Sequence, residues 1–279
     1  MSDARTTVVI ATRNRAAELD RSLRELRALR PTPPVVVVDN GSYDDTAALV
    51  RRDFPEVRLV SLAGNAGVAA RNIGVRRAET PYVAFSDDDS WWEQGALPRA
   101  ETLFDAYPRV GLLAATTLVG PRAEPDPVCA LLADSPLGTA PDVPGPLVLG
   151  FLACSAIVRR QAFLQVGGFS ELLHFGAEET LLAYDLAAAG WALSYVDQLR
   201  AHHHPSTTRP PARWRRRLEL RNNALIALMR RPVPQLLRSL GPLLNEPAAA
   251  AGALRRLPHA LGRRRRLPRH VEAQIRELT

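Results

Sequence analysis

The first 120 residues alternate between short apolar runs and stretches with helical periodicity. The apolar runs are rich in β-branched and aromatic residues, as strands are, and the stretches between them place apolar residues at helical spacing. The predicted strands are Thr6–Thr12, Pro34–Asp39, Val57–Ser61 and Tyr82–Ser86, and the predicted helices are Ala16–Leu29, Thr46–Phe54 and Val68–Ala78. This alternation predicts an α/β fold with a mostly parallel central sheet flanked by helices.

The pattern changes after residue 119. Residues 120–146 contain seven prolines and show no clear periodicity, so we predict a long loop. The predicted elements that follow are a strand at Leu147–Val158, helices at Arg160–Val166 and Glu178–Ala189, and a strand at Ala192–Val196. From residue 213 onward, prolines including Pro258 are expected to cut the chain into short helical pieces.

Charge is distributed unevenly along the 279 residues. Residues 1–199 hold 18 Arg against 25 Asp and Glu, whereas residues 200–279 hold 18 Arg against four Glu. The net charge of +7 therefore combines an acidic body with a strongly basic C-terminal extension. A hydrophobic content of 46% excludes disorder of the chain as a whole.

Several features predict a cytoplasmic protein. Cys129 and Cys154 form no metal-ligand pattern, and one pair cannot make a disulfide framework, so we expect free thiols. The N-terminus lacks the apolar segment of a secretory signal, and the longest uncharged apolar run, residues 147–158, is too short to span a bilayer. The chain is expected to be soluble or peripheral.

Three predicted strands end in polar clusters, namely Thr12–Arg15, Asp39–Ser42 and Asp87–Asp89. Each cluster alone is compatible with ordinary loop and helix-cap chemistry. Together they lie at the carboxyl edge of one parallel sheet, where such sheets bind ligands. Neighbouring carboxylates repel unless a cation compensates them, so Asp87–Asp89 indicates Mg²⁺ or Mn²⁺ bridging to a diphosphate.

A basic and glycine-containing segment accompanies this edge. Residues 64–74 (GNAGVAARNIG) bring glycines before a helix, an arrangement that suits an anion, although the segment is neither a P-loop nor a GxGxxG motif. The arginines that accompany it in sequence are Arg13, Arg15, Arg71, Arg76 and Arg77.

Two further clusters have alternative interpretations. Glu178 and Glu179 open a predicted helix, where acidic residues are also favoured by the helix dipole. His202–His204 follows a predicted strand and is either a solvated loop or a source of a metal ligand.

Taken in order, these motifs resemble those of the family 2 glycosyltransferases, which are inverting enzymes of the GT-A fold. The matching segments, within residues 6–204, are TRNR, VVVVDNGS, NAGVAARNIG, FSDDDSWW, VGGFSE, AEETLLAYDLAAAGW and YVDQLRAHHH. The resemblance implies a metal-dependent transfer of a sugar from a UDP-, dTDP- or GDP-linked donor to an acceptor hydroxyl. It implies a GT-A domain over 1–205, with a nucleotide-sugar-binding half (1–119) and an acceptor and catalytic half (120–205), followed by a helical extension (206–279).

The resemblance also implies roles for the matching residues. Metal binding falls to Asp89 and His203, with His202 as the alternative ligand, and the catalytic base is Glu179, with Glu178 as the alternative. The family usually has Asp where Glu179 stands. Gly168, Phe169 and Trp91 match positions on the acceptor side. The residues implied in nucleotide-sugar binding are Thr12, Arg13, Asn14, Asp39, Asn65, Arg71, Asn72, Asp87 and Asp88.

The family resemblance also bears on whether the reaction is processive. Processive members carry Gln-x-x-Arg-Trp, but here Pro210 stands in the place of Gln before Arg213-Trp214. A non-processive enzyme is therefore expected, acting on a cell-envelope or polysaccharide precursor or on a metabolite. The alternatives are a sugar-1-phosphate nucleotidyltransferase, whose usual signature contains a Lys that this chain lacks, and a catalytically silent GT-A-like binding or scaffold protein.

The arginine-rich extension is interpreted separately. It is either a solvated helical appendage or a peripheral contact with the anionic inner face of the plasma membrane, where a lipid-linked acceptor would lie. Nucleic acid is not expected as a partner, because Trp214 is the extension's one aromatic residue and there is no stacking pattern.

Overall fold

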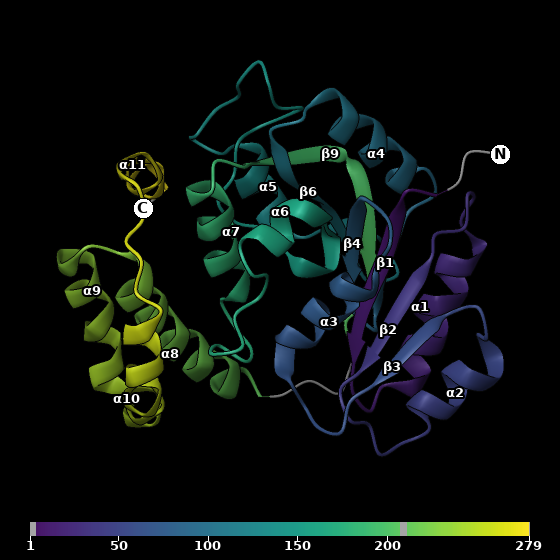
Figure 1. Ribbon diagram of the computed structural model, residues 1–279, viewed down its shortest axis with the longest axis horizontal. Helices are drawn as coiled ribbons and strands as arrows, with labels where there is room; N and C mark the ends of the chain where they lie inside the picture. Colours follow the sequence, from purple (N-terminus) through teal and green to yellow (C-terminus); the bar gives the residue numbers. More distant parts are fainter. Residues whose placement is uncertain (1–3, 207–210, 279) are drawn as a thin grey trace.

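The computed structural model describes residues 4–206 and 211–278, and a nine-stranded sheet forms its centre (Figure 1). The strands are β1 (Thr6–Thr12), β2 (Val35–Asp39), β3 (Arg58–Ser61), β4 (Tyr82–Ser86), β5 (Ser90–Trp92), β6 (Val110–Val119), β7 (Glu124–Pro125), β8 (Ala156–Arg159) and β9 (Ala192–His203). Their order is β3-β2-β1-β4-β8-β6-β9-β5, and β7 pairs with β6.

Helices cover both faces of this sheet and continue beyond it. They are α1 (Ala16–Ala28), α2 (Thr46–Asp53), α3 (Ala70–Arg77), α4 (Ala96–Ala106), α5 (Pro127–Ala133), α6 (Arg160–Gln165), α7 (Glu178–Ala188), α8 (Ala212–Arg230), α9 (Val233–Leu240), α10 (Pro247–Gly262) and α11 (Arg269–Glu277). Short 3₁₀ helices occupy Gly67–Ala69, Ala153–Ser155 and Gly241–Asn245.

The N-terminal part of the sheet confirms the predicted parallel arrangement. Strand β1 pairs in parallel with β2 and β4, and β2 pairs in parallel with β3. Val9 packs in the core cluster that contains α3, whereas Val8 and Ile10 pack in the cluster that contains α1. Both faces are thus buried, which explains why these runs are apolar without alternation. Thr12 pairs with Asp39, so β1 and β2 end at one edge.

The other part of the sheet has mixed strand directions. Strand β8 runs antiparallel between β4 and β6, β6 and β9 are parallel, and β5 is antiparallel to β9. In the β5–β9 pair, Ser90 lies opposite His203 and Trp91 opposite His202. This pairing carries the end of β9 to the Asp87–Asp89 turn.

Several predicted boundaries were wrong. The strand expected at Leu147–Val158 exists only as β8, and Val148, Leu149 and Phe151 are apolar because they are buried outside any strand. A short apolar run does not reveal which backbone form is buried. The predicted loop at 120–146 contains α5, which Asp126 caps by accepting a hydrogen bond from Val128 N at 3.0 Å.

Longer elements also replace two shorter predictions. Strand β9 continues to His203 rather than ending at Val196. Helix α10 continues through Pro258, where an interruption was expected. In both cases packing against the rest of the molecule outweighs the local signal.

The extension packs against residues 120–205. Leu225, Ile226 and Met229 of α8 share a buried cluster with Leu173 and with Leu181 of α7. Figure 1 shows α8 to α11 gathered on the side of α7 that faces away from β1–β3. The extension therefore shares a core with the α/β unit.

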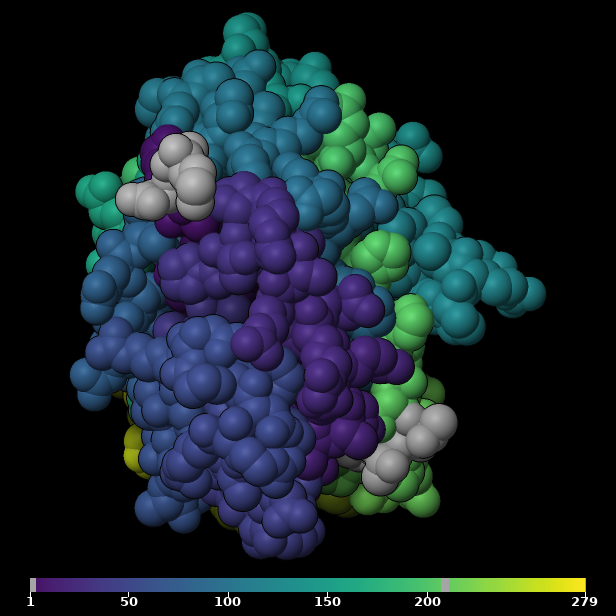
Figure 2. Space-filling model, turned by 90° about the vertical axis from the view of Figure 1, so that its right-hand side faces the viewer, coloured from purple at the N-terminus to yellow at the C-terminus, as the bar shows by residue number. Residues whose placement is uncertain are grey.

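The surface adds two observations. The face in Figure 2 is formed largely by purple and blue atoms of the N-terminal third, and a teal lobe from the middle of the chain projects to one side. Within the described residues, no helix combines the length and the apolar character needed to cross a bilayer. Cys129 and Cys154 are both buried free thiols, as predicted.

Candidate active site

The turn after β4 meets the end of β9 in a compact cluster of acidic and imidazole groups. One ligand atom each from Asp87, Asp89 and His203 lies within 4.8 Å of the others. His203 Nε2 is 3.3 Å from Asp89 Oδ1. Two carboxylates and an imidazole suit Mn²⁺ or Mg²⁺, so these three residues form a set that could hold a divalent cation.

His202 is turned toward different neighbours. Its Nε2 lies 4.0 Å from Glu93 Oε1, and its ring stacks on Trp91 with 5.6 Å between centroids. Adjacent residues of a strand point to opposite faces, so His202 and His203 cannot both face the cluster. The geometry favours His203.

Asp89 also fixes the segment that leaves β9. Its Oδ2 accepts a hydrogen bond from Ser206 N at 2.9 Å, and its carbonyl oxygen accepts one from His204 N at 2.8 Å. Asp89 is buried, so these bonds hold the start of the extension against the cluster.

Asp88 is directed toward β1. The Thr12 hydroxyl donates to Asp88 Oδ2 at 3.0 Å. Burial, followed by the neighbouring Asp87 and Asp89 carboxylates, raises the pKa of Asp88 to about 7. Asp88 therefore does not belong to the cluster formed by Asp87, Asp89 and His203.

Arg71 connects the acidic turn with α7. Its Nη2 donates to Asp87 Oδ1, and the side chain is buried. Burial acts to lower the pKa of Arg71, but the carboxylates of Asp87, Glu178 and Glu179 outweigh it and raise the pKa. Among the described residues, no hydrogen-bond acceptor reaches Arg71 Nε, although that atom is buried.

The acidic pair begins α7 beside this guanidinium. Ala177, in the left-handed region with φ of +58°, turns the chain into the helix. Burial raises the pKa of both Glu178 and Glu179, and repulsion from Glu178 raises that of Glu179 further. Glu178 Oε2 is buried and has no hydrogen-bond partner within the part of the chain that the structure describes. A ligand that donates a hydrogen bond to this pair, or that takes up a proton from it, would therefore be favoured at this position.

A cleft of about 420 Å³ collects most of the residues predicted to bind a nucleotide sugar and a metal. It is lined by Thr12, Arg13, Asn65, Arg71, Asp87, Asp88, Asp89 and His203, among others. We call it the donor cleft. Three carboxylates and several arginines facing one space would suit a metal with a diphosphate.

Two predicted residues shape the loops beside the donor cleft without lining it. Asp39 Oδ1 accepts a hydrogen bond from Ser42 N, and Asn14 Oδ1 accepts one from Tyr43 N, both at 2.9 Å. Asn40, which follows Asp39, does line the cleft, and its side chain holds Ala66 N and Gly67 O at 3.0 Å each.

Asn72 lies on the other side of α3 from the donor cleft. Its amide donates to Phe169 O at 2.8 Å and accepts from Phe169 N at 2.9 Å. Gly168 has φ of +72°, and a Cβ there would lie 2.6 Å from Asn72 Oδ1. Asn72, Gly168 and Phe169 therefore form one clamp, which lines a second cavity.

Trp91 lines neither space. Its ring packs against His202 and His204 and is 9% exposed. The acceptor role implied for Trp91 remains a prediction that this geometry does not support.

The prediction missed several residues that line the donor cleft, namely Asn40, His174, Phe175, Trp214 and Arg215, and gave Arg15 no specific role. Trp214 and Arg215 come from the extension. The rings of Trp214 and Phe175 are 5.6 Å apart. Only the isolation of Trp214 as the aromatic residue of a basic segment offered a signal in the sequence.

Gly67 lets the two sides of the cleft touch. Val68 N donates to His174 O at 2.8 Å, and a Cβ on Gly67 would lie 2.2 Å from that oxygen. Gly67 also has φ of +62°, so both space and conformation require glycine.

The loop around His174 is held from behind by α8. Asn222, fully buried, donates to the carbonyls of Leu173, Phe175 and Gly176 at 3.1, 2.8 and 2.5 Å. Arg221 Nη2 donates to Leu173 O at 2.6 Å. We call Arg221 and Asn222 the α8 brace.

Comparison with known sequences identifies the family. The sequence model described as Glycosyl transferase family 2 matches residues 7–166. The chain belongs to glycosyl transferase family 2.

Two relatives show how far along the chain the similarity extends. Pre-mycofactocin glycosyltransferase of Mycobacterium tuberculosis is 34% identical over 215 residues, covering 73% of this chain and 43% of that protein. N-acetylglucosaminyl-diphospho-decaprenol L-rhamnosyltransferase of the same species is 27% identical over 241 residues, covering 74% of this chain and 78% of that protein. The chain thus spans less than half the length of the first relative.

Solved structures confirm the GT-A-type fold of this family 2 chain. A mannosyltransferase from Pyrobaculum calidifontis, in complex with GDP-Man and Mn²⁺, has a TM-score of 0.59 at 21% identity and covers 98% of this chain and 74% of its own. S. aureus TarS 1-349, in complex with UDP-GlcNAc, has a TM-score of 0.61 at 19% identity and covers 80% and 66%. At these identities the likeness concerns the fold.

Proposed function

We propose that this chain transfers a sugar from a nucleotide-diphospho-sugar to an acceptor hydroxyl, with inversion at the anomeric carbon. The observation that carries the proposal is the cluster of Asp87, Asp89 and His203 inside a cleft that several arginines also line. Family membership supports it.

The donor would lie in the donor cleft, mainly against residues 1–119. Arg13, Arg71 and Arg215 line the cleft, and the Nε atoms of Arg71 and Arg215 are buried with no hydrogen-bond partner among the described residues. A diphosphate would give these donors the charged acceptors that they lack. Bound UDP-GlcNAc and GDP-Man in structures of the same fold support a nucleotide sugar, linked to UDP, dTDP or GDP.

Asp87, Asp89 and His203 would hold Mg²⁺ or Mn²⁺. When bound there, the cation would neutralise charge on the departing diphosphate. Arg71, already paired with Asp87, would add a fixed positive charge at the same place.

Glu179 would act as the base, and Glu178 is the alternative. As the acceptor oxygen bonds to the anomeric carbon, its proton passes to the Glu179 carboxylate, and the bond to the diphosphate oxygen breaks. One in-line displacement inverts the carbon and needs no covalent intermediate. The raised pKa of Glu179 suits a base that works near neutral pH.

The acceptor would approach across residues 120–205, next to Gly168 and Phe169. A non-processive reaction on a lipid-linked cell-envelope precursor fits best, because one relative is named for an acceptor joined to decaprenol through a diphosphate. Exposed apolar residues of α9, namely Val233, Leu237 and Leu240, together with the many arginines, support peripheral contact with an anionic membrane.

Thermal unfolding with UDP, GDP, dTDP and CDP, each with and without Mn²⁺, tests the donor site. A nucleotide at 100 times its Kd should add roughly 2.7 kcal/mol of stability. We expect a metal-dependent shift with one of them in the wild type and its loss in Asp89→Asn. If no nucleotide shifts the unfolding temperature, the chain is better described as a catalytically silent binding protein.

A further inference from the structure

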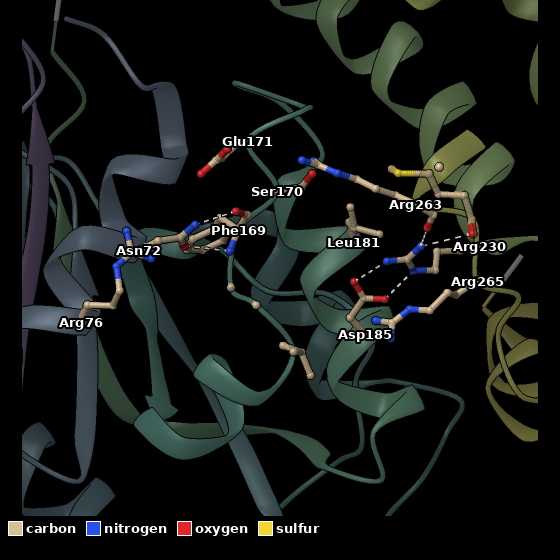
Figure 3. Close-up of a pocket in the computed structure, with 15 residues that line it drawn as sticks. Asn72, Arg76, Phe169, Ser170, Glu171, Leu181, Asp185, Arg230, Arg263 and Arg265 are labelled. Atoms are coloured by element: carbon tan, nitrogen blue, oxygen red, sulfur yellow. Dashed lines mark hydrogen bonds and ion pairs between the residues drawn. The ribbon is translucent and has the colours of Figure 1, made fainter. Parts of the chain in front are cut away.

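A second cavity, of about 450 Å³, lies between α3, residues 166–171, α7 and the extension (Figure 3). It shares no lining residue with the donor cleft. We call it the arginine cavity, because Arg76, Arg230, Arg263 and Arg265 line it against two carboxylates, Glu171 and Asp185.

The charge of one of these arginines, Arg230, is balanced by an ion pair within the protein. Arg230 Nε and Nη2 contact Asp185 Oδ1 and Oδ2 at 2.5 and 2.9 Å, and Arg230 is buried. Arg230 Nη1 also donates to Arg263 O at 2.9 Å, which fixes the backbone that carries the next arginines. This buried pair forms a rigid and nearly neutral wall.

The charges of the other three arginines are not balanced by a carboxylate among the described residues. Among the described residues, no carboxylate lies within ion-pair distance of Arg76, Arg263 or Arg265, and Glu171 is the one remaining acid in the lining. In Figure 3 the Arg263 and Arg265 side chains extend from the extension toward Ser170 and Asp185, while Arg76 lies on the α3 side. Guanidinium groups arranged around one space suit phosphate oxygens.

Helix α7 connects the arginine cavity with the proposed catalytic pair, which begins that helix. Leu181 and Asp185 of α7 line it, and at 1.5 Å per residue Asp185 is about 9 Å along the helix from Glu179. On α3, Arg71 lines the donor cleft, whereas the next residue, Asn72, lines the arginine cavity. Different faces of α3 thus line the two spaces, and α7 runs from the catalytic pair to the arginine cavity.

An apolar surface leads away from the cavity. Leu254, Leu257 and Leu261 of α10 are exposed at helical spacing, with Leu261 51% exposed, and Gly262 and Arg263 follow directly in the cavity lining. A ligand with an anionic head and an apolar tail would match both features.

We propose that the arginine cavity binds the phosphate or diphosphate group of a lipid-linked acceptor, with the lipid along the α10 leucines. This rests on the proposed function, since it places an acceptor hydroxyl near Glu179. Arg263 and Arg265 bind the phosphate oxygens, and Arg76 closes the site from α3.

Calorimetry with inorganic pyrophosphate in EDTA tests the anion site without the metal-dependent donor site. The wild type binds, and Arg263→Gln combined with Arg265→Gln weakens binding at least about tenfold, or about 1.4 kcal/mol. Arg255→Gln is the matched control, because Arg255 is exposed on α10 and lies outside the cavity lining. Absence of binding, or equal binding by the double variant, overturns the proposal.

Further ligands distinguish the source of the phosphate. Geranyl diphosphate should bind more tightly than pyrophosphate, and Leu257→Ser with Leu261→Ser should remove the difference. If phosphatidylglycerol vesicles require Arg263 and Arg265 while geranyl diphosphate does not bind, the site is a membrane contact and the acceptor assignment is wrong.

The nucleotide assay separates this proposal from the proposed function. The Arg263 and Arg265 double variant should keep the Mn²⁺-dependent nucleotide shift of the wild type, since neither residue lines the donor cleft. Loss of that shift in the double variant contradicts the separation of the two sites. A wild type that binds geranyl diphosphate but no nucleotide contradicts the transferase function and leaves the anion site standing.

Discussion

Thr12, Arg13 and the Asp87–Asp89 turn reach the donor cleft from strand ends, whereas Trp214 and Arg215 reach it from a helix that follows the whole α/β unit. The strand ends are adjacent because a parallel sheet aligns them. The extension arrives only through packing of α8 against α7 and the α8 brace. Sheet topology thus positions one part of the cleft lining, and tertiary packing of the extension positions the other.

The largest effect is expected where these two parts meet, at the start of α7. Glu179→Gln keeps the side-chain volume but removes the proton acceptor, so transfer should fall about 10²- to 10⁴-fold. The nucleotide-dependent shift in unfolding temperature should persist. Steady-state kinetics and thermal unfolding measure the two properties.

Glu178→Gln decides which member of the pair is the base, and Glu124→Gln, at an exposed ion pair with Arg122, is the matched control. A larger loss of transfer in Glu178→Gln than in Glu179→Gln would reverse the assignment.

The α8 brace should have the next largest effect. Asn222→Ala removes the side-chain donor of the Phe175 and Gly176 carbonyls, whereas Leu173 O keeps its bond from Arg221, so the free energy of unfolding should fall by roughly 1–3 kcal/mol. Urea denaturation measures this loss. Asn245→Ala, at an exposed position, should be close to neutral. Equal stability of the two variants would show that the brace does not hold the loop.

Trp214→Ala tests whether the extension contributes to the donor cleft. Loss of the ring pair with Phe175 should lower the free energy of unfolding by about 0.5–1.5 kcal/mol. Because Trp214 also lines the donor cleft, its removal should weaken nucleotide-sugar binding. Trp214→Phe should recover most of the affinity. A donor KM that is unchanged in Trp214→Ala would confine the cleft to the α/β unit.

The smallest effect is a displacement of the pH profile. Burial and Glu178 raise the pKa of Glu179, while Arg71 lowers it and Asp87 raises it. A base must be ionised, so kcat/KM should fall as pH drops through a value clearly above the 4.5 of an ordinary Glu. A limb near 4.5 would contradict this account.

Stability should change in the opposite sense. A carboxyl with a raised pKa in the folded state stabilises the fold least when it is ionised, so stability is lost as pH rises through that pKa. Glu179→Gln should therefore raise the unfolding temperature at alkaline pH relative to the wild type. No gain would show that the pair is not strained when charged.

The N-terminal half was largely predictable, because apolar runs buried on both faces and polar strand ends are local signals. Local chemistry also marked the Asp87–Asp89 turn, whereas the role expected of Glu179 came from the family resemblance. The strand wrongly expected at Leu147–Val158 shows the limit, since Val148 and Phe151 are buried outside any strand and only an isolated bridge joins Leu147 to Ser194 of β9.

The features of the candidate site that the sequence did not predict depend on contacts between residues far apart in the chain. Asn72 was expected beside the sugar, but its amide is engaged by Phe169, 97 residues away. Neither the stacking of Trp91 on His202 nor the reach of Trp214 leaves a periodic signal in the sequence.

Asp89 has a consequence for how the protein is made. Its partner Ser206 lies 117 positions later in the chain, and His203 comes just before. During synthesis, the ribosome must therefore release β9 before the acidic turn can find the groups that complete it. A nascent chain that stops short of this point would carry a finished parallel sheet but an open, repelling trio of aspartates. The candidate metal-binding cluster is thus completed late, after most of the α/β unit has already emerged.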